Sequence, residues 1–161
     1  MDNIMLTELQ AMRDLMSGGQ REYFEAMLSG AKCVTCTPLA QVFSKEEIRL
    51  IGSFVRKKEC YKNAHLMTLY FPDVEYVEGK VQLECGISID HAFNRRGDQY
   101  FDITWELALG NSVEGIPYLS IGEYSSKTIM EVTLETGYYG DIFRNLYIKN
   151  LNNHGKESNN Q

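Results

Sequence analysis

Cys60, His91 and Asp102 are the residue types that carry out nucleophilic thiol chemistry, and they occur in this order along the chain. In such a site a thiolate attacks an acyl carbon and an imidazole moves the protons. A carboxylate holds the imidazole in one tautomer and one orientation. The three positions are far apart in the sequence, so each must be positioned by a different element of secondary structure.

Cys60 is expected at the start of a helix. This helix should end before Pro72, because a proline disfavours helical geometry in the residue before it. A helix N-terminus offers unpaired N–H groups and the positive end of the helix dipole, and both favour a thiolate. The run SFVRKKECYKNA contains no helix breaker, however. One continuous helix through Cys60 is therefore the alternative, and the dipole would then have little effect on the thiol.

His91 and Asp102 lie on either side of a turn signal, Arg96-Gly97-Asp98, between two apolar segments typical of strands. Side chains that lie directly opposite each other on adjacent strands are about 5 Å apart. The midpoint of positions 91 and 102 falls inside the turn, so we predict that the two residues are cross-strand partners. Asp102 would then orient the imidazole while its other nitrogen faces the thiol.

Four segments resemble the papain-like and transglutaminase-like superfamily: ECYKNA at 59–64, YVEGKV at 76–81, HAFN at 91–94 and YFDITW at 100–105. The resemblance covers roughly residues 45–110. It implies a Cys-His-Asp site and attack of a thiolate on an amide or acyl carbon. It also implies release of the acyl group to water or to an amine.

Three positions depart from the usual pattern of that superfamily: Phe93 and Ile103 replace a common Trp and Pro, and Phe54 stands where papain-type enzymes carry Gln. The oxyanion donor is consequently open between the Cys60 backbone N–H and the Asn63 side chain. Candidate residues for a substrate cleft are Phe93, Asn94 and Trp105, although aromatic residues of a sheet usually belong to the core.

Periodicity predicts the elements that must hold these residues. Ser44 and Glu47 form a capping box that begins a strongly amphipathic helix. Further helices are expected over 4–16, 20–28, 60–70 and 126–135, and strands over 74–86, 87–94 and 98–109. Residues 30–41 are expected to form a loop or short extended structure, and residues 111–125 a loop.

This order predicts an α+β fold in which N-terminal helices pack on an antiparallel sheet. The length of 161 residues suits one domain. We expect that domain to span residues 1–149. Residues 150–161, NLNNHGKESNNQ, contain one leucine and no aromatic residue, so a disordered tail is expected there.

The net charge is −6, and the acidic excess falls entirely on residues 60–161. This balance disfavours nucleic acid as a partner and favours a protein, peptide or amide substrate that carries basic groups. No segment has the 18–20 apolar residues of a membrane span, and the start MDNIMLTELQ lacks the basic region of a signal peptide. We therefore expect a cytoplasmic protein that does not bind a membrane. The sequence does not indicate the oligomeric state.

Free thiols are expected for the four cysteines because the cytoplasm keeps them reduced. Cys33 and Cys36 form a CxxC pair, but a structural zinc site usually needs a second close pair, so neither metal nor another cofactor is expected. His65 lies on the wrong side of its helix to assist Cys60. The main alternative to an enzyme is a catalytically silent, acidic protein of this fold that binds or inhibits a basic partner. A zinc-supported binding module is a third possibility.

Overall fold

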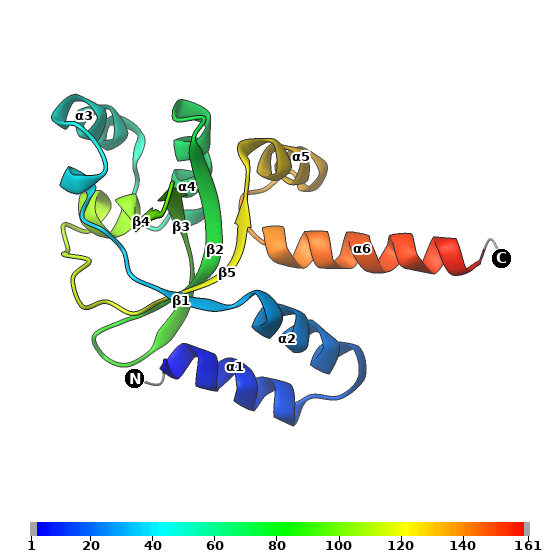
Figure 1. Ribbon diagram of the computed structural model, residues 1–161. Coiled ribbons are helices and arrows are strands. Elements are labelled where there is room, and N and C mark those ends of the chain that lie inside the picture. The colour runs from blue at the N-terminus through cyan, green and yellow to red at the C-terminus, as the bar shows by residue number, and fades with distance from the viewer. Residues whose placement is uncertain (1–2, 160–161) are drawn as a thin grey trace.

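The computed structural model describes residues 3–159 and contains a curled, five-stranded antiparallel sheet packed with helices (Figure 1). The strand order is β1-β5-β2-β3-β4. β2 pairs with β3 on one side and with β5 on the other, so it is the central strand. The strands are β1 Lys32–Val34, β2 Val74–Gln82, β3 Ser88–Arg96, β4 Gln99–Phe101 and β5 Tyr118–Tyr124.

The α+β class expected from the sequence is confirmed, and the first five α-helices begin close to the predicted positions. The Ser44 hydroxyl accepts a hydrogen bond from the Glu47 N–H, and the Glu47 carboxylate accepts one from the Ser44 N–H, which completes the capping box. The helices are α1 Ile4–Leu15, α2 Gly18–Gly30, η1 Leu39–Gln41, α3 Lys45–Phe54, α4 Cys60–Tyr70, η2 Thr104–Ala108, α5 Ser126–Thr136 and α6 Ile142–Ser158.

Apolar clusters lie on both faces of the sheet, because successive residues of a strand point to opposite faces. On β5, Leu119 belongs to a cluster with α1 and α2. Its neighbour Tyr118 belongs to a cluster with Phe93 and Trp105. A residue of β3 can therefore be buried on either face, and the four positions from His91 to Asn94 are all buried.

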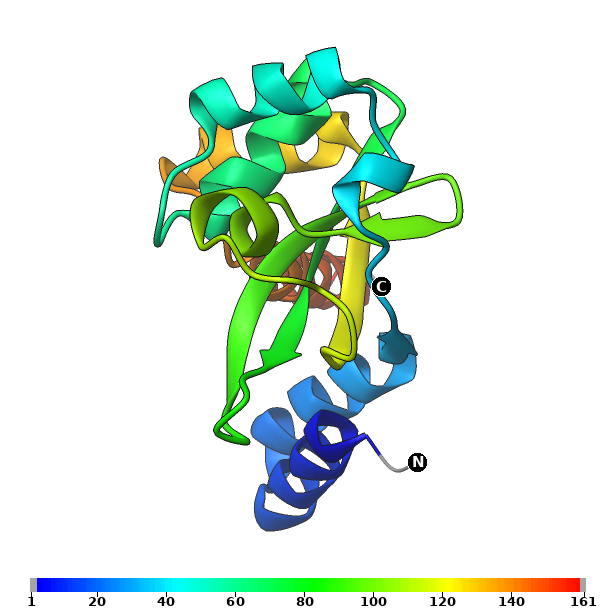
Figure 2. The same ribbon diagram turned by 90° about the vertical axis from the view of Figure 1, so that its left-hand side faces the viewer.

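The sheet curls so far that its two edges are connected. Cys36, just beyond the edge strand β1, forms a bridge with Tyr100 in the opposite edge strand β4. The Thr37 N–H donates to the Tyr100 carbonyl oxygen at 2.7 Å. The chain that leaves β1 accordingly passes beside the β3–β4 hairpin (Figure 2), and the curl encloses the cluster that contains Phe93, Trp105 and Tyr118.

The strand predicted over 98–109 is wrong beyond Phe101, because β4 ends there and η2 is a π-helical turn. Asp102 causes this change: its Oδ1 accepts a hydrogen bond from the Trp105 N–H at 3.0 Å. Side-chain capping of this kind competes with strand pairing. The loop predicted over 111–125 is also wrong, since its second half is β5, a strand paired on both sides.

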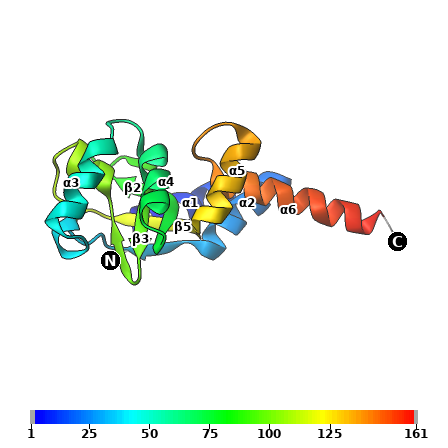
Figure 3. The ribbon, with the colours of Figure 1, turned by 90° about the horizontal axis from the view of Figure 1, so that it is seen from above.

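In place of the structureless tail expected from residue 150, the chain continues as α6 to Ser158, and residues 160–161 lie outside the described part. Ile142 anchors the first turn in the core, and extending an existing helix is far easier than nucleating one. The distal turns project from the body of the protein (Figure 3), and every residue from Ile148 to Asn159 is exposed. Within residues 3–159, no helix combines the length and apolar character that crossing a bilayer requires.

Gly79 is the one position of β2 where a side chain is sterically excluded by the sheet itself. A Cβ atom there would lie 1.8 Å from the Leu119 carbonyl oxygen, at the irregularity in the β2–β5 pairing. Gly79→Ala should therefore lower the free energy of unfolding by ~2 kcal/mol or more, because backbone must move. Gly52→Ala is the matched control: nothing lies within 4 Å of its new methyl group in α3, so it should stabilise the protein by about 0.5–1 kcal/mol. Urea unfolding measures both, and equal midpoints for Gly79→Ala and the wild type would contradict this packing.

Candidate active site

The β3–β4 hairpin brings His91 and Asp102 close together, although the strand register differs from the predicted one. The turn is Gly97-Asp98, as expected, and Gly97 has a φ of 58°, which favours glycine. The register places Asn94 opposite Phe101, however, so the prediction that His91 and Asp102 are cross-strand partners is wrong. Asp102 reaches the imidazole because β4 ends at Phe101 and the chain turns back there.

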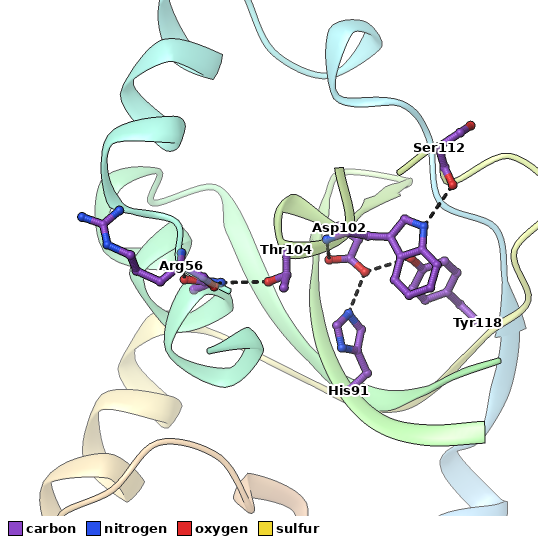
Figure 4. Close-up of polar contacts among 8 residues, drawn as sticks. Arg56, His91, Asp102, Thr104, Ser112 and Tyr118 are labelled. Carbon is purple, nitrogen blue, oxygen red and sulfur yellow. Dashed lines mark hydrogen bonds and ion pairs between the residues drawn. The ribbon is translucent and has the colours of Figure 1, made fainter. Parts of the chain in front are cut away.

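Asp102 is the polar centre of the site, and its side chain is 1% exposed. Its Oδ2 lies 2.6 Å from His91 Nε2 and accepts a hydrogen bond from the Tyr118 hydroxyl at 2.8 Å, while the Trp105 N–H binds Oδ1 (Figure 4). Three donors from three different elements thus compensate one buried carboxylate, as burial of a charge demands. The predicted hydrogen-bond contact between His91 and Asp102 is confirmed.

Burial of the His91 ring opposes protonation, but the charge and hydrogen bond of Asp102 outweigh this effect with help from the neighbouring Cys60 thiol. Together they raise the pKa of His91 to about 10. The ring is therefore an imidazolium at neutral pH. Because Asp102 engages Nε2, the nitrogen left for the sulfur is Nδ1, which points away from the carboxylate in Figure 4.

Cys60 is the first residue of α4, and the alternative of one continuous helix is excluded. α3 ends at Phe54, and Lys58 adopts a left-handed conformation with φ 62° in the connection. The first N–H groups of an α-helix have no intrahelical partner. In α4 the N-cap residue Glu59 does not accept a hydrogen bond from them with its side chain. The thiol is partly exposed and adjacent to the imidazolium.

Asn63 fixes the break between α3 and α4. Its Oδ1 accepts a hydrogen bond from the Arg56 N–H at 3.0 Å, and its Nδ2 donates to the Arg56 carbonyl oxygen at 2.7 Å. Nδ2 also donates to Thr104 Oγ1 in η2 at 2.9 Å. The side chain is fully buried with its donors used. Asn63 is therefore not available as an oxyanion donor, which corrects the expectation from the sequence and leaves the Cys60 N–H as the candidate.

The residues expected to line a substrate cleft lie in the interior. Phe93 is 1% exposed and packs against Tyr118, and Asn94 is completely buried and donates to the Ala64 and Glu75 carbonyl oxygens. Neither residue lines a described cavity, so the expectation is wrong for both. Trp105 is 7% exposed and borders a small cavity of about 370 Å³ at the β2–β3 turn. The strand pattern did not reveal that both faces of β3 are covered.

The remaining cysteines and His65 do not join the site as metal ligands. Cys33 is exposed and Cys36 is buried, so the two residues of the CxxC pair lie in different environments. No three potential ligands gather anywhere in residues 3–159. His65 is a packing residue, in edge contact with the Tyr139 ring, and burial lowers its pKa.

Tyr118 and Thr104 belong to the site, but the sequence analysis missed them. Tyr118 begins YLSIGEY, whose partial alternation is a weak strand signal after Pro117. Burial and the Asp102 charge raise the pKa of Tyr118, so its hydroxyl stays protonated and remains a donor. Nothing in the local sequence indicates that Thr104 would receive the Asn63 amide, because that contact joins residues from separate elements.

Comparison with known proteins gave no match: no protein-family model, no curated protein and no solved structure corresponds to the chain.

The His91–Asp102 pair makes the stability of the protein dependent on pH in a defined direction. The pKa of His91 is higher in the folded state than the value of 6.5 of a free histidine, so its contribution is fully present below pH ~6.5 and is lost as the pH rises through about 10. The free energy of unfolding should therefore fall between these pH values. Asp102→Asn should flatten this decrease, because the amide can still cap η2 but carries no charge. NMR titration of the imidazoles should show His91 titrating well above His65; the reverse order would refute the pair.

Proposed function

We propose that the protein is a thiol-dependent hydrolase or acyltransferase that acts on an amide, isopeptide or acyl bond. Cys60 is the nucleophile, His91 carries the protons and Asp102 orients the imidazole. The observation that supports this proposal best is the buried 2.6 Å contact between His91 and Asp102 beside a partly exposed thiol. If the His91–Asp102 pair had only a structural role, no thiol at a helix N-terminus would be needed next to the imidazole.

In the first half of the reaction, the Cys60 sulfur attacks the carbonyl carbon as a thiolate, which the adjacent imidazolium and the α4 N-terminus stabilise. The carbonyl oxygen becomes an oxyanion, and the Cys60 N–H is the nearest candidate donor to it. The C–N or C–O bond then breaks as His91 donates its proton to the leaving group. The product of this half is a thioester on Cys60.

In the second half, water or an amine attacks the thioester. The neutral imidazole accepts a proton from the attacking group, the C–S bond breaks, and the acyl product leaves. The sulfur returns as a thiolate beside the regenerated imidazolium, so the cycle closes without a metal or another cofactor. Asp102 holds the imidazole in place by its hydrogen bond and compensates the positive charge on His91.

The papain-like or transglutaminase-like assignment is part of the same proposal. Its support is the order of the elements: a cysteine at the first position of α4, a histidine on β3 and an aspartate directly after β4. A cytoplasmic location also remains a proposal, supported by four free cysteines. The acidic excess of residues 60–161 favours a basic protein or peptide as the substrate.

Selective alkylation of Cys60 tests whether the thiol is activated. With iodoacetamide at pH 7, Cys60 should react at least tenfold faster than Cys33 and Cys85, which are more exposed but have no imidazolium beside them. Peptide mass spectrometry gives the rate at each cysteine. His91→Ala should bring the Cys60 rate down to that of the two exposed controls. Equal rates in the wild type would instead favour the catalytically silent, acidic binding protein.

Tyr118→Phe tests whether the tyrosine hydroxyl positions Asp102. Loss of a hydrogen bond to a charged group should cost ~1.5–3 kcal/mol of stability. Because His91 would then take a larger share of the carboxylate charge, the resonance of the Nε2 proton should move downfield in ¹H NMR of ¹⁵N-histidine-labelled protein. Tyr100→Phe is the control, since the Tyr100 hydroxyl binds Glu123 outside the site. A resonance that moves equally in both variants would show a merely structural role.

A further inference from the structure

A groove of about 610 Å³ lies on the side of the sheet covered by α1 and α2. Its apolar wall consists of side chains from these two helices and from β5, among them Leu9, Met27 and Ile121. The start of α6 closes it on the other side through Phe143. The volume is in the range of pockets that hold small organic ligands or a few amino-acid residues.

The groove reaches the N-terminus of α4, because it is lined by Tyr61, which directly follows Cys60 in the first turn of that helix. Asp90 lines the groove from β3, and the side chain of the next residue, His91, lies on the other face of the sheet because successive strand residues point to opposite faces. Gly79, which also lines it, lies directly opposite His91 in the β2–β3 pairing. A ligand that lies along the groove therefore extends towards the partly exposed thiol.

Charged side chains around the groove are predominantly acidic. Lys80 and Asp90 compensate each other in an ion pair of 2.7 Å. Glu78 caps α6 by accepting hydrogen bonds from the N–H groups of Ile142 and Phe143. Glu8 and Asp141 are both exposed and form no ion pair with any residue in 3–159.

Arg144 is the only basic group of the groove other than the paired Lys80. Glu8, Glu78 and Asp141 also line the groove, so acidic residues outnumber basic ones there and the groove keeps a negative excess. A ligand that combines an apolar chain with a positive charge can pack against the apolar wall and be attracted by the acidic side chains. An anionic ligand would be repelled by these side chains.

We propose that this groove binds the part of the substrate next to the scissile bond, and that this part is an apolar chain ending in an ammonium or guanidinium group, as in a lysine or arginine side chain. The inference rests on the proposed function, because it takes Cys60 as the reacting atom. It adds the substrate class and the site that selects it.

Binding can be measured without turnover in the Cys60→Ser variant. Phenethylammonium is the probe, and 3-phenylpropionate, of similar size and opposite charge, is the matched control. The probe should shift the ¹³C-methyl resonances of Met12 and Met27, which line the groove, and leave the buried Met67 unchanged. Glu8→Gln combined with Asp141→Asn should weaken binding about three- to tenfold. Equal or tighter binding of the anion, or shifts outside the groove, would overturn the proposal.

Protection of the thiol tests whether the groove leads to Cys60 in the wild-type protein. The acetylated and amidated peptide Ala-Leu-Lys-Leu-Ala should slow alkylation of Cys60 at least threefold and leave Cys33 and Cys85 unaffected, whereas the peptide with Glu in place of Lys should not protect. Binding in the groove without protection of Cys60 would overturn its role as the substrate site. A slow Cys60 in the ligand-free protein is a separate result, which counts against the proposed function.

Discussion

The amide of Asn63 holds together the two parts of the chain that the candidate active site requires. By bonding both the N–H and the C=O of Arg56, it closes the connection between α3 and α4 and makes Cys60 the first residue of a helix. Through Thr104 it also joins that helix to the turn that follows Asp102. Each of these buried polar groups would cost about 1–3 kcal/mol if left unpaired, so the position of the nucleophile is tied to the stability of the fold.

A second constraint comes from the curl of the sheet. β4 pairs with only the last three residues of β3, so it leaves the His91 end of that strand without a partner on this side. α4 packs against β3 and brings its N-terminus to this uncovered end, where the thiol meets the ring. On the inner side of the curl, Tyr118 crosses from β5 to reach the same carboxylate. The site therefore depends on residues from both halves of the sheet.

Local signals in the sequence were sufficient where an element is determined by its own residues. The capping box at Ser44, the end of α4 before Pro72 and the turn at Gly97 all follow from backbone chemistry within a few positions. The same signals were also sufficient to predict that His91 and Asp102 lie close together. β5 was missed because its pairing partners are distant in sequence, and the role of Asn63 was misassigned because two of its three bonds fix a turn that no local breaker signals.

Asp102 has two functions that the chain cannot separate. One oxygen holds the imidazole, and the other terminates β4 by capping η2. A descendant that lost its chemistry would still be selected to keep this carboxylate, because folding alone demands it. Cys60 is partly exposed and lies outside every apolar cluster. The fold does not require this residue, so it would be substituted first. Among natural variants, the sulfur is thus the informative marker of activity, and the aspartate is not.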